Sequence, residues 1–180
     1  MVKTSHHKTH YRGEVFTIKS MHVHFPGKTV RHEYVDPKNR GSVFIVPVDE
    51  QRNVYLVEMY CTAMRKRELL CPAGMMDTSE TPAQVAKREC QEEAGFLPQK
   101  VTLLGIVEPS PGYNNHTSYI YLGQKLKKSK LYTGDEPEEL KVVKVPLAKI
   151  PQLMKKKKLM HASSILAIMM AEKYLQRHNL

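Results

Sequence analysis

The hydrophobic and polar positions near the start of the chain fit a pair of β-strands. Residues 14–25 and 28–35 carry the pattern, and Pro26-Gly27 between them is a turn signal, so we expect a first hairpin here. Residues 1–12 are polar, rich in His and without a periodicity that would bury one face. We therefore expect a flexible polar tail before the hairpin.

The pattern repeats further along the chain. Residues 42–48 and 54–60 are rich in Val, Ile, Phe and Tyr and are joined by a polar connection, which predicts a second hairpin. Additional strands are expected over residues 101–108, 117–123 and 140–145, and a closing amphipathic helix over residues 163–177. No internal repeat interrupts this order.

One helix has a complete set of start and stop signals. Thr81 is the expected N-cap, Pro82 the first helical residue and Gln84 the partner of a capping box, while Gly95 should end the helix. Because helices and strands alternate irregularly, we predict a mixed α/β fold with helices packed against a mixed sheet. Residues 13–180 should form a single domain.

Composition is that of an ordinary folded chain. It has 180 residues, of which 41% are hydrophobic and 26% charged, with no apolar stretch of membrane-spanning length or signal-peptide type, so we expect a cytoplasmic location. The net charge of +10 favours anionic partners, although the runs of lysine at 125–130 and 155–158 are more typical of solvated faces. The three cysteines have no metal-type spacing and should behave as small hydrophobic residues.

Three carboxylates gather on the predicted helix. Glu89, Glu92 and Glu93 are three and four residues apart, which places them on one face near the C-terminal end, where both mutual repulsion and the helix dipole disfavour anions. A hard divalent cation would compensate them, since Mg²⁺ commonly joins carboxylates to substrate phosphates. The alternative is an acidic helix end that faces solvent.

The wider spacing decides between these alternatives. Gly74, Glu80, Arg88, the three glutamates and Gly95 stand in the order and spacing of the Nudix box, so the chain resembles Nudix hydrolases. The resemblance implies a Nudix-type α/β/α sandwich with a mixed sheet, preceded by an N-terminal antiparallel strand pair. It also implies that Glu89, Glu92, Glu93 and the backbone carbonyl of Ala73 hold Mg²⁺, or alternatively Mn²⁺, while Gly74, Glu80, Arg88 and Gly95 support the loop and helix.

Two further segments are similar to the ADP-ribose pyrophosphatase and nucleotide-sugar hydrolase branch. Residues 72–77 read Pro-Ala-Gly-Met-Met-Asp before the helix, and Ser110, Pro111 and Gly112 follow it as expected substrate contacts. An acidic segment before Leu140 is similar to the loop that supplies a catalytic glutamate in that branch. The resemblance favours Glu138 for this role, with Glu136 and Glu139 as alternates, and Glu92 as a further catalytic residue.

The chain also departs from the branch. Cys61 stands where an arginine is common and Leu70 where a glutamate is common, so Arg65, Arg67 and Glu68 are candidates for the missing substrate contacts. In the absence of Trp, the candidates to stack on a base are Phe25, Tyr34 and Tyr113.

The predicted function is Mg²⁺-dependent hydrolysis of ADP-ribose or a related nucleoside diphosphate sugar to a nucleoside monophosphate and a sugar phosphate. Two alternatives stay open, an RNA 5′-end pyrophosphohydrolase and a catalytically inactive nucleotide sensor, although no RNA-binding module accompanies the charge, which makes nucleic acid an improbable partner. The resemblance further implies a homodimer with the strands of residues 13–36 at its interface.

Overall fold

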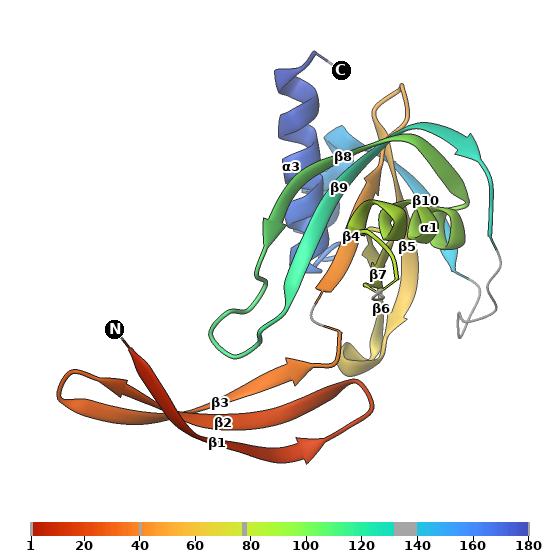
Figure 1. Cartoon of the computed structure of the whole chain (residues 1–180). Coiled ribbons are helices and arrows are strands. Elements are labelled where there is room, and N and C mark those ends of the chain that lie inside the picture. Colours follow the sequence, from red (N-terminus) through yellow and green to blue (C-terminus); the bar gives the residue numbers. More distant parts are fainter. Residues whose placement is uncertain (1, 40, 77–78, 132–139, 180) are drawn as a thin grey trace.

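The computed structural model describes residues 2–39, 41–76, 79–131 and 140–179. Its strands and helices form an N-terminal sheet, here called the arm, and a core with two sheets and two main helices (Figure 1). The arm contains β1 (Lys3–Arg12), β2 (Phe16–Phe25) and β3 (Lys28–Pro37), all antiparallel. No helix among the described residues is long and apolar enough to span a membrane.

The predicted tail at residues 1–12 is wrong, because residues 3–12 form β1 and pair with β2. The pairing is supported by polar side chains and not by an apolar face: Ser5 shares a hydrogen bond with His24 (2.7 Å), and His10 shares one with Ser20 (2.7 Å). Hydrophobic periodicity cannot detect such a strand. The first hairpin is confirmed, with Gly27 at φ +78° in its turn.

The four-stranded core sheet has the order β7-β4-β9-β8, in which β4 and β9 are parallel and the other pairs antiparallel. Its strands are β4 (Gly41–Pro47), β7 (Ala73–Met75), β8 (Phe96–Val107) and β9 (Thr117–Lys128). The second core sheet has the order β10-β5-β6 and consists of β5 (Asn53–Cys61), β6 (Lys66–Leu70) and β10 (Lys141–Pro146).

The second hairpin is not formed as predicted. Both strands exist, but β4 and β5 enter different sheets and share only an isolated bridge between Val48 and Val54. The physical reason is that β4 is apolar on both faces: Val43 and Ile45 pack beside one helix, and Phe44 and Val46 beside the other. A strand covered on both faces belongs at the centre of a sheet between helices.

Those helices are α1 (Pro82–Ala94) and α3 (Ala162–Arg177), with a short α2 (Ile150–Lys155) between. α1 contributes Val85, Ala86 and Cys90 to one buried cluster. On the opposite face of β4, α3 contributes buried residues to the other cluster, namely Ala167, Ile168, Ala171 and Leu175. The α/β/α arrangement with a mixed sheet is therefore confirmed, with three N-terminal strands where two were predicted.

Candidate active site

The acidic helix α1 is positioned by the signals read from its sequence. The Thr81 hydroxyl accepts a hydrogen bond from the Gln84 N–H, the Gln84 side chain accepts one from the Thr81 N–H (2.8 Å), and Pro82 follows the cap. Gly95 ends the helix at φ +76° and donates its N–H to the Cys90 carbonyl oxygen. Both predicted ends are confirmed, so the register of the glutamates on the helix is well defined.

Glu89, Glu92 and Glu93 are all buried, with between 5% and 8% of each residue exposed. Three carboxylates removed from water would strongly destabilise a fold without positive compensation. The alternative of an acidic helix end that faces solvent is wrong, because all three residues are buried. Each carboxylate therefore needs an electrostatic partner.

Arg88 is the main partner. Its Nη1 donates to Glu89 Oε1 (2.6 Å) and to Glu92 Oε2 (2.9 Å), and its Nε donates to Glu80 Oε2 (3.0 Å). Burial lowers the pKa of the Arg88 guanidinium, but Glu89, and then Glu80 and Glu92, outweigh this and raise that pKa above its ordinary value. Arg88 is thus firmly cationic, and the predicted pairing of Glu80 with Arg88 is present.

The remaining contacts fit the cluster closely against β7. Glu93 Oε2 accepts a hydrogen bond from the Ala73 N–H (2.9 Å). A Cβ added to Gly74 would lie 1.8 Å from Glu89 Oε1, so a larger residue here would force the Glu89 carboxylate to move. Glu92 Oε1 is buried without a hydrogen-bond partner in the described part of the chain.

These observations test whether the residues fit a divalent cation. The donors are hard carboxylate oxygens, one of them buried and unsatisfied, and the Arg88 Nη1 bridges the two carboxylates that a cation would share. With the carboxylates arranged around Arg88 in this way, the described residues contain no group of three His, Cys, Asp or Glu side chains that could hold a metal ion. The donor set fits Mg²⁺ or Mn²⁺ in chemistry, and a shift of the carboxylates around Arg88 would be needed to complete it.

Of the predicted substrate contacts, Pro111 and Gly112 line one pocket, and Ser110, Arg65, Arg67 and Glu68 are not among its lining residues. Ser110 begins a turn in which its carbonyl oxygen accepts from the Asn114 N–H (2.9 Å), whereas Arg65 and Arg67 are exposed around the β5 to β6 connection. Glu68 forms an ion pair with Lys66 (2.6 Å). Glu136, Glu138 and Glu139 lie outside the described residues.

The structure does bring the three candidate stacking residues together. Phe25, Tyr34 and Tyr113 line one pocket of about 620 Å³ with Pro111 and Gly112, between the arm and the loop that joins β8 to β9. The Val35 N–H donates to the Tyr113 carbonyl oxygen (2.7 Å), and this hydrogen bond joins the arm to the loop between β8 and β9. The sequence did not indicate that these three aromatic residues would line one pocket, because they belong to different elements of the chain.

His116 was not singled out from the sequence. It shares a hydrogen bond with Ser42 (2.8 Å), and burial lowers the pKa of its imidazole. Ser42 also pairs with Met75 of β7, the residue after Gly74. His116 and the strand that supports Glu89 therefore both lie next to the start of β4. His116 belongs to no local sequence motif, so only its contact with Ser42 in the folded chain singles it out.

Comparison with known proteins agrees with this geometry. Residues 38–166 match the NUDIX domain, which is more than half of the chain. The chain is 30% identical over 166 residues to the ADP compounds hydrolase NudE of Escherichia coli K12, covering 92% of this chain and 88% of that protein.

Two further similarities extend over most of the chain. It is 27% identical to the ADP-ribose pyrophosphatase of Bacillus subtilis 168, over 92% of this chain and 88% of that protein. A crystal structure of an ADP compounds hydrolase superposes with a TM-score of 0.90 at 29% identity, covering 98% of this chain and 95% of that one. The chain therefore belongs to the Nudix hydrolase family.

Proposed function

We propose that the protein hydrolyses the pyrophosphate bond of ADP-ribose or a related nucleoside diphosphate sugar, which yields AMP or another nucleoside monophosphate and a sugar phosphate. The observation that carries the proposal is the buried glutamate cluster on α1, packed against Gly74 and bridged by Arg88. The similarity to an ADP compounds hydrolase and to an ADP-ribose pyrophosphatase supports the substrate class.

Glu89, Glu92 and Glu93, with the carbonyl of Ala73, would hold Mg²⁺ or Mn²⁺. When bound, such a cation neutralises pyrophosphate oxygens and lowers the pKa of a bound water. Arg88 keeps the carboxylates of Glu89 and Glu92 together, and Glu80 in turn orients Arg88. The chain thus presents a prearranged cluster of carboxylates to the cation, and the charge of the cation would offset the negative charge of the substrate.

The nucleoside end of the substrate is assigned to the pocket between the arm and the β8 to β9 loop. Phe25, Tyr34 and Tyr113 offer ring faces for the base, and Pro111 and Gly112 line the same pocket. The first residues of β4 connect this pocket to the glutamate cluster, because Ser42 contacts His116 and pairs with Met75. An extended dinucleotide-like substrate would reach both.

The test replaces the glutamates without removing their bulk. Glu92→Gln and Glu93→Gln should each lose most of their activity, about 10²-fold or more, and retain the fold, because charge is removed from the cluster and packing is kept. Glu50→Gln, at an exposed turn, is the matched control. Near-wild-type turnover in both cluster variants, with circular dichroism unchanged, would overturn the metal assignment.

The substrate is identified with a panel. Monophosphate release would be measured from ADP-ribose, other ADP-sugars, GDP-mannose, dinucleoside polyphosphates and 5′-capped RNA. Preference for ADP-ribose or an ADP-sugar supports the proposal, preference for capped RNA supports RNA 5′-end hydrolysis, and no release from any substrate supports an inactive sensor.

The general base is proposed to be Glu138, which would deprotonate or orient the attacking water. Glu138→Gln should lower kcat by about 10² to 10⁴ with little change in KM, as expected for a group that acts on rate and not on binding. Glu136→Gln and Glu139→Gln are position controls. Wild-type kcat in all three variants would leave the helix glutamates, Glu92 first, as the source of the base.

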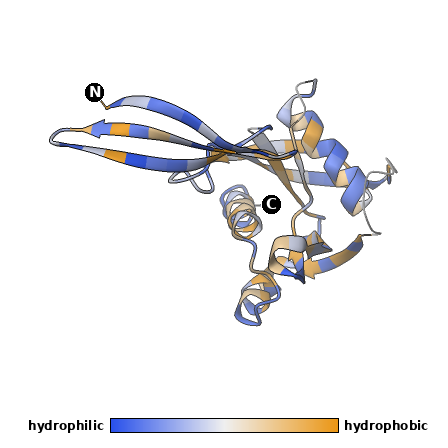
Figure 2. Cartoon of the chain, turned by 90° about the horizontal axis from the view of Figure 1, so that it is seen from below, coloured by the Kyte–Doolittle hydropathy of each residue, from blue (hydrophilic) through white to orange (hydrophobic). Residues whose placement is uncertain are grey.

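A homodimer is the proposed assembly, with the arm at its interface. The arm contributes no residue to the buried hydrophobic core of the single chain, within the described residues, yet it extends the molecule well beyond the core (Figure 2). A small sheet without an apolar cover is rarely stable by itself. Sedimentation should find a dimer, and an active monomer at assay concentration would refute the proposal.

A further inference from the structure

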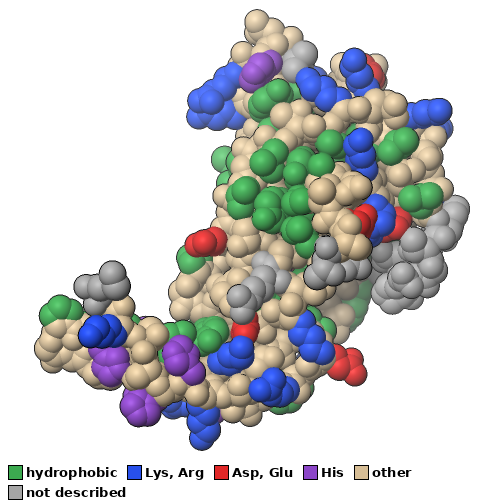
Figure 3. Space-filling view, viewed as in Figure 1, with side chains coloured by type: hydrophobic (Ala, Val, Ile, Leu, Met, Phe, Trp, Pro, Cys, Tyr) green, Lys and Arg blue, Asp and Glu red, His purple; other side chains and the backbone are tan. Residues whose placement is uncertain are grey.

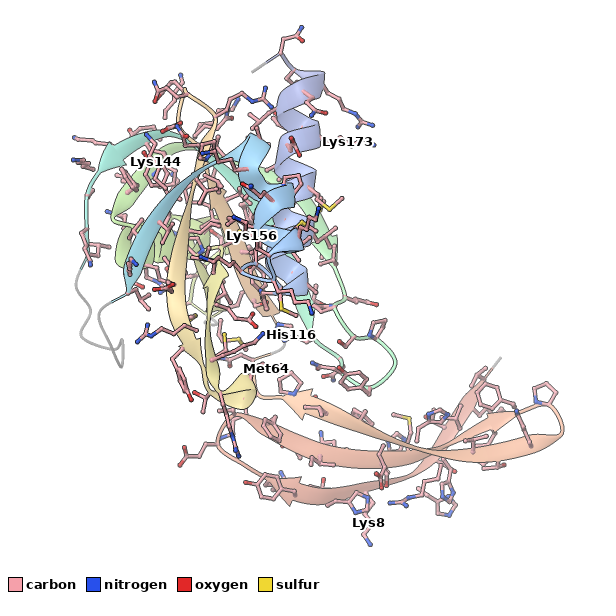
Figure 4. All side chains as sticks on the ribbon, turned by 180° about the vertical axis from the view of Figure 1, so that it is seen from behind. Lys8, Met64, His116, Lys144, Lys156 and Lys173 are labelled. Carbon is pink, nitrogen blue, oxygen red and sulfur yellow. The ribbon has the colours of Figure 1, made fainter. Side chains whose placement is uncertain are left out.

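A second pocket, of about 570 Å³, lies at the C-terminal end of α1. It is lined by parts of both core sheets, and Glu89, Glu92 and Glu93 are not among its lining residues. Figure 4 shows Lys144, one of its lining residues, on the part of the core remote from the arm, whereas His116 lies at the end that faces the arm. This pocket is therefore distinct from the proposed active site.

Each sheet contributes one aromatic residue and one lysine to the pocket, and in each case the two are direct cross-strand partners. Phe96 of β8 is opposite Lys128 of β9, and Tyr55 of β5 is opposite Lys144 of β10. Side chains that are directly opposite lie on the same face of a sheet. The Tyr55 and Phe96 rings meet with centroids 4.5 Å apart and planes tilted by 54°, so the two sheets join in an angled aromatic floor with a lysine at each side.

A third lysine, Lys130 in the segment after β9, also lines the pocket. Lys144 and Lys128 differ in whether an acidic side chain already pairs with them. Lys144 forms an ion pair with Asp49 (2.8 Å) and lies 5.5 Å from the centre of the Tyr55 ring. Lys128 is exposed, and no acidic side chain of the described residues lies within ion-pair distance of it. An anion in this pocket would therefore meet at Lys128 a cation that no carboxylate of the described residues already pairs with.

The C-terminal end of α1 is hydrogen-bonded to the segment that follows β9. The Ser129 N–H donates to the carbonyl oxygen of the C-cap Gly95 (3.0 Å), and the Leu131 N–H donates to the carbonyl oxygen of Gln91 in the last turn (3.4 Å). The Gln91 amide also donates to the Ser129 hydroxyl (2.9 Å). These contacts hold the segment after β9, which contributes Ser129 and Lys130 to the pocket, against the C-terminal end of α1.

We propose that this pocket is a second binding site for a free nucleotide, with the base on Tyr55 and Phe96 and the phosphate at Lys128. A planar ring beside a phosphate is the ligand that an aromatic floor with a basic rim recognises, and the volume falls in the range of small-molecule sites, about 300 to 1,000 Å³. The inference does not rest on the proposed hydrolysis, since no residue of the glutamate cluster takes part.

The experiment uses AMP as the probe and the full chain in buffer with a chelator, so that turnover is prevented. Amide chemical shifts of Gly95 and Ser129 report on this pocket and not on the one between arm and core. AMP should shift both signals in a saturable way. Lys128→Glu should weaken that binding about tenfold or more, the effect of removing one charge-assisted hydrogen bond.

Lys127→Glu is the matched control, because it makes the same change of charge on the neighbouring exposed residue of β9, which does not line the pocket. It should change the affinity by less than about threefold. Equal losses in both variants, or no AMP-dependent shift of Gly95 and Ser129, would overturn the site. Equal binding of inorganic phosphate would overturn the nucleotide assignment, since the rings would then contribute nothing.

Discussion

The arm and the core are stabilised in opposite ways. The core buries β4 between two helices, and all of the buried hydrophobic residues of the described chain lie at Val43 or later. The arm carries cross-strand His–Ser contacts and the exposed Arg31–Glu33 pair, and Figure 3 shows Lys, Arg and His side chains along it. The core is stabilised by its buried apolar side chains, whereas the arm is held by backbone pairing and polar contacts.

The largest expected difference is between two isoleucines. Ile45 is fully buried in β4, and Ile18 is half-buried in β2. Ile45→Ala should lower the free energy of unfolding by about 2 to 5 kcal/mol, because it leaves a cavity, whereas Ile18→Ala should cost less than about 1.5 kcal/mol at low protein concentration. Urea unfolding measures both.

The same two isoleucine substitutions also test the proposed dimer. If a second subunit covers the arm, the cost of Ile18→Ala should rise with protein concentration, and that of Ile45→Ala should not. Equal costs for the two substitutions at every concentration would contradict the contrast between arm and core.

The next effect concerns two glycines, one at the glutamate cluster and one in the loop that meets the arm. Gly74→Ala would push a methyl group into the Glu89 carboxylate, whereas nothing lies within 4 Å of a Cβ at Gly112. Gly74→Ala should therefore destabilise the protein by about 1 to 3 kcal/mol and Gly112→Ala by less than about 0.5 kcal/mol. Thermal unfolding of the two variants checks this, and equal melting temperatures would show that Glu89 can move aside freely.

The smallest effect is a pH dependence in the core. Burial alone raises the pKa of Asp49, but hydrogen bonds from Lys144, Asn53 and Tyr55 outweigh it and lower that pKa from 3.8 to about 2. A lowered folded-state pKa contributes stability that is present above the unfolded value and is lost as the pH falls from about 4 to about 2. The contribution should be about 1 kcal/mol, reduced by the exposure of Lys144.

The measurement is the free energy of unfolding at pH 5 and pH 2.5. Asp49→Asn should be less stable than wild type at pH 5, and the difference should shrink at pH 2.5. Glu33→Gln is the control from the arm, because its exposed pair with Arg31 should contribute almost nothing at either pH. A constant deficit of Asp49→Asn across this range would contradict the assignment.

Local signals predicted the part of the site that is built locally. The caps at Thr81 and Gly95 lie within a few residues of the helix they end, and Glu89, Glu92 and Glu93 share a face because of the helical period. The pairing of Glu80 with Arg88 was inferred from the family pattern and is present. Such features depend on residues that are close in sequence, so the sequence alone can predict them.

Tertiary structure alone decided the rest. Whether β4 pairs with β5 depends on what covers its two faces, which no hydrophobic run reveals, and β1 is held by His–Ser contacts that carry no hydrophobic period. The pocket that gathers Phe25, Tyr34 and Tyr113, and the second pocket where Tyr55 meets Phe96, join residues far apart in the chain. These features arise from long-range packing, whose free energy depends on which surfaces meet and not on the order of residues within any one element.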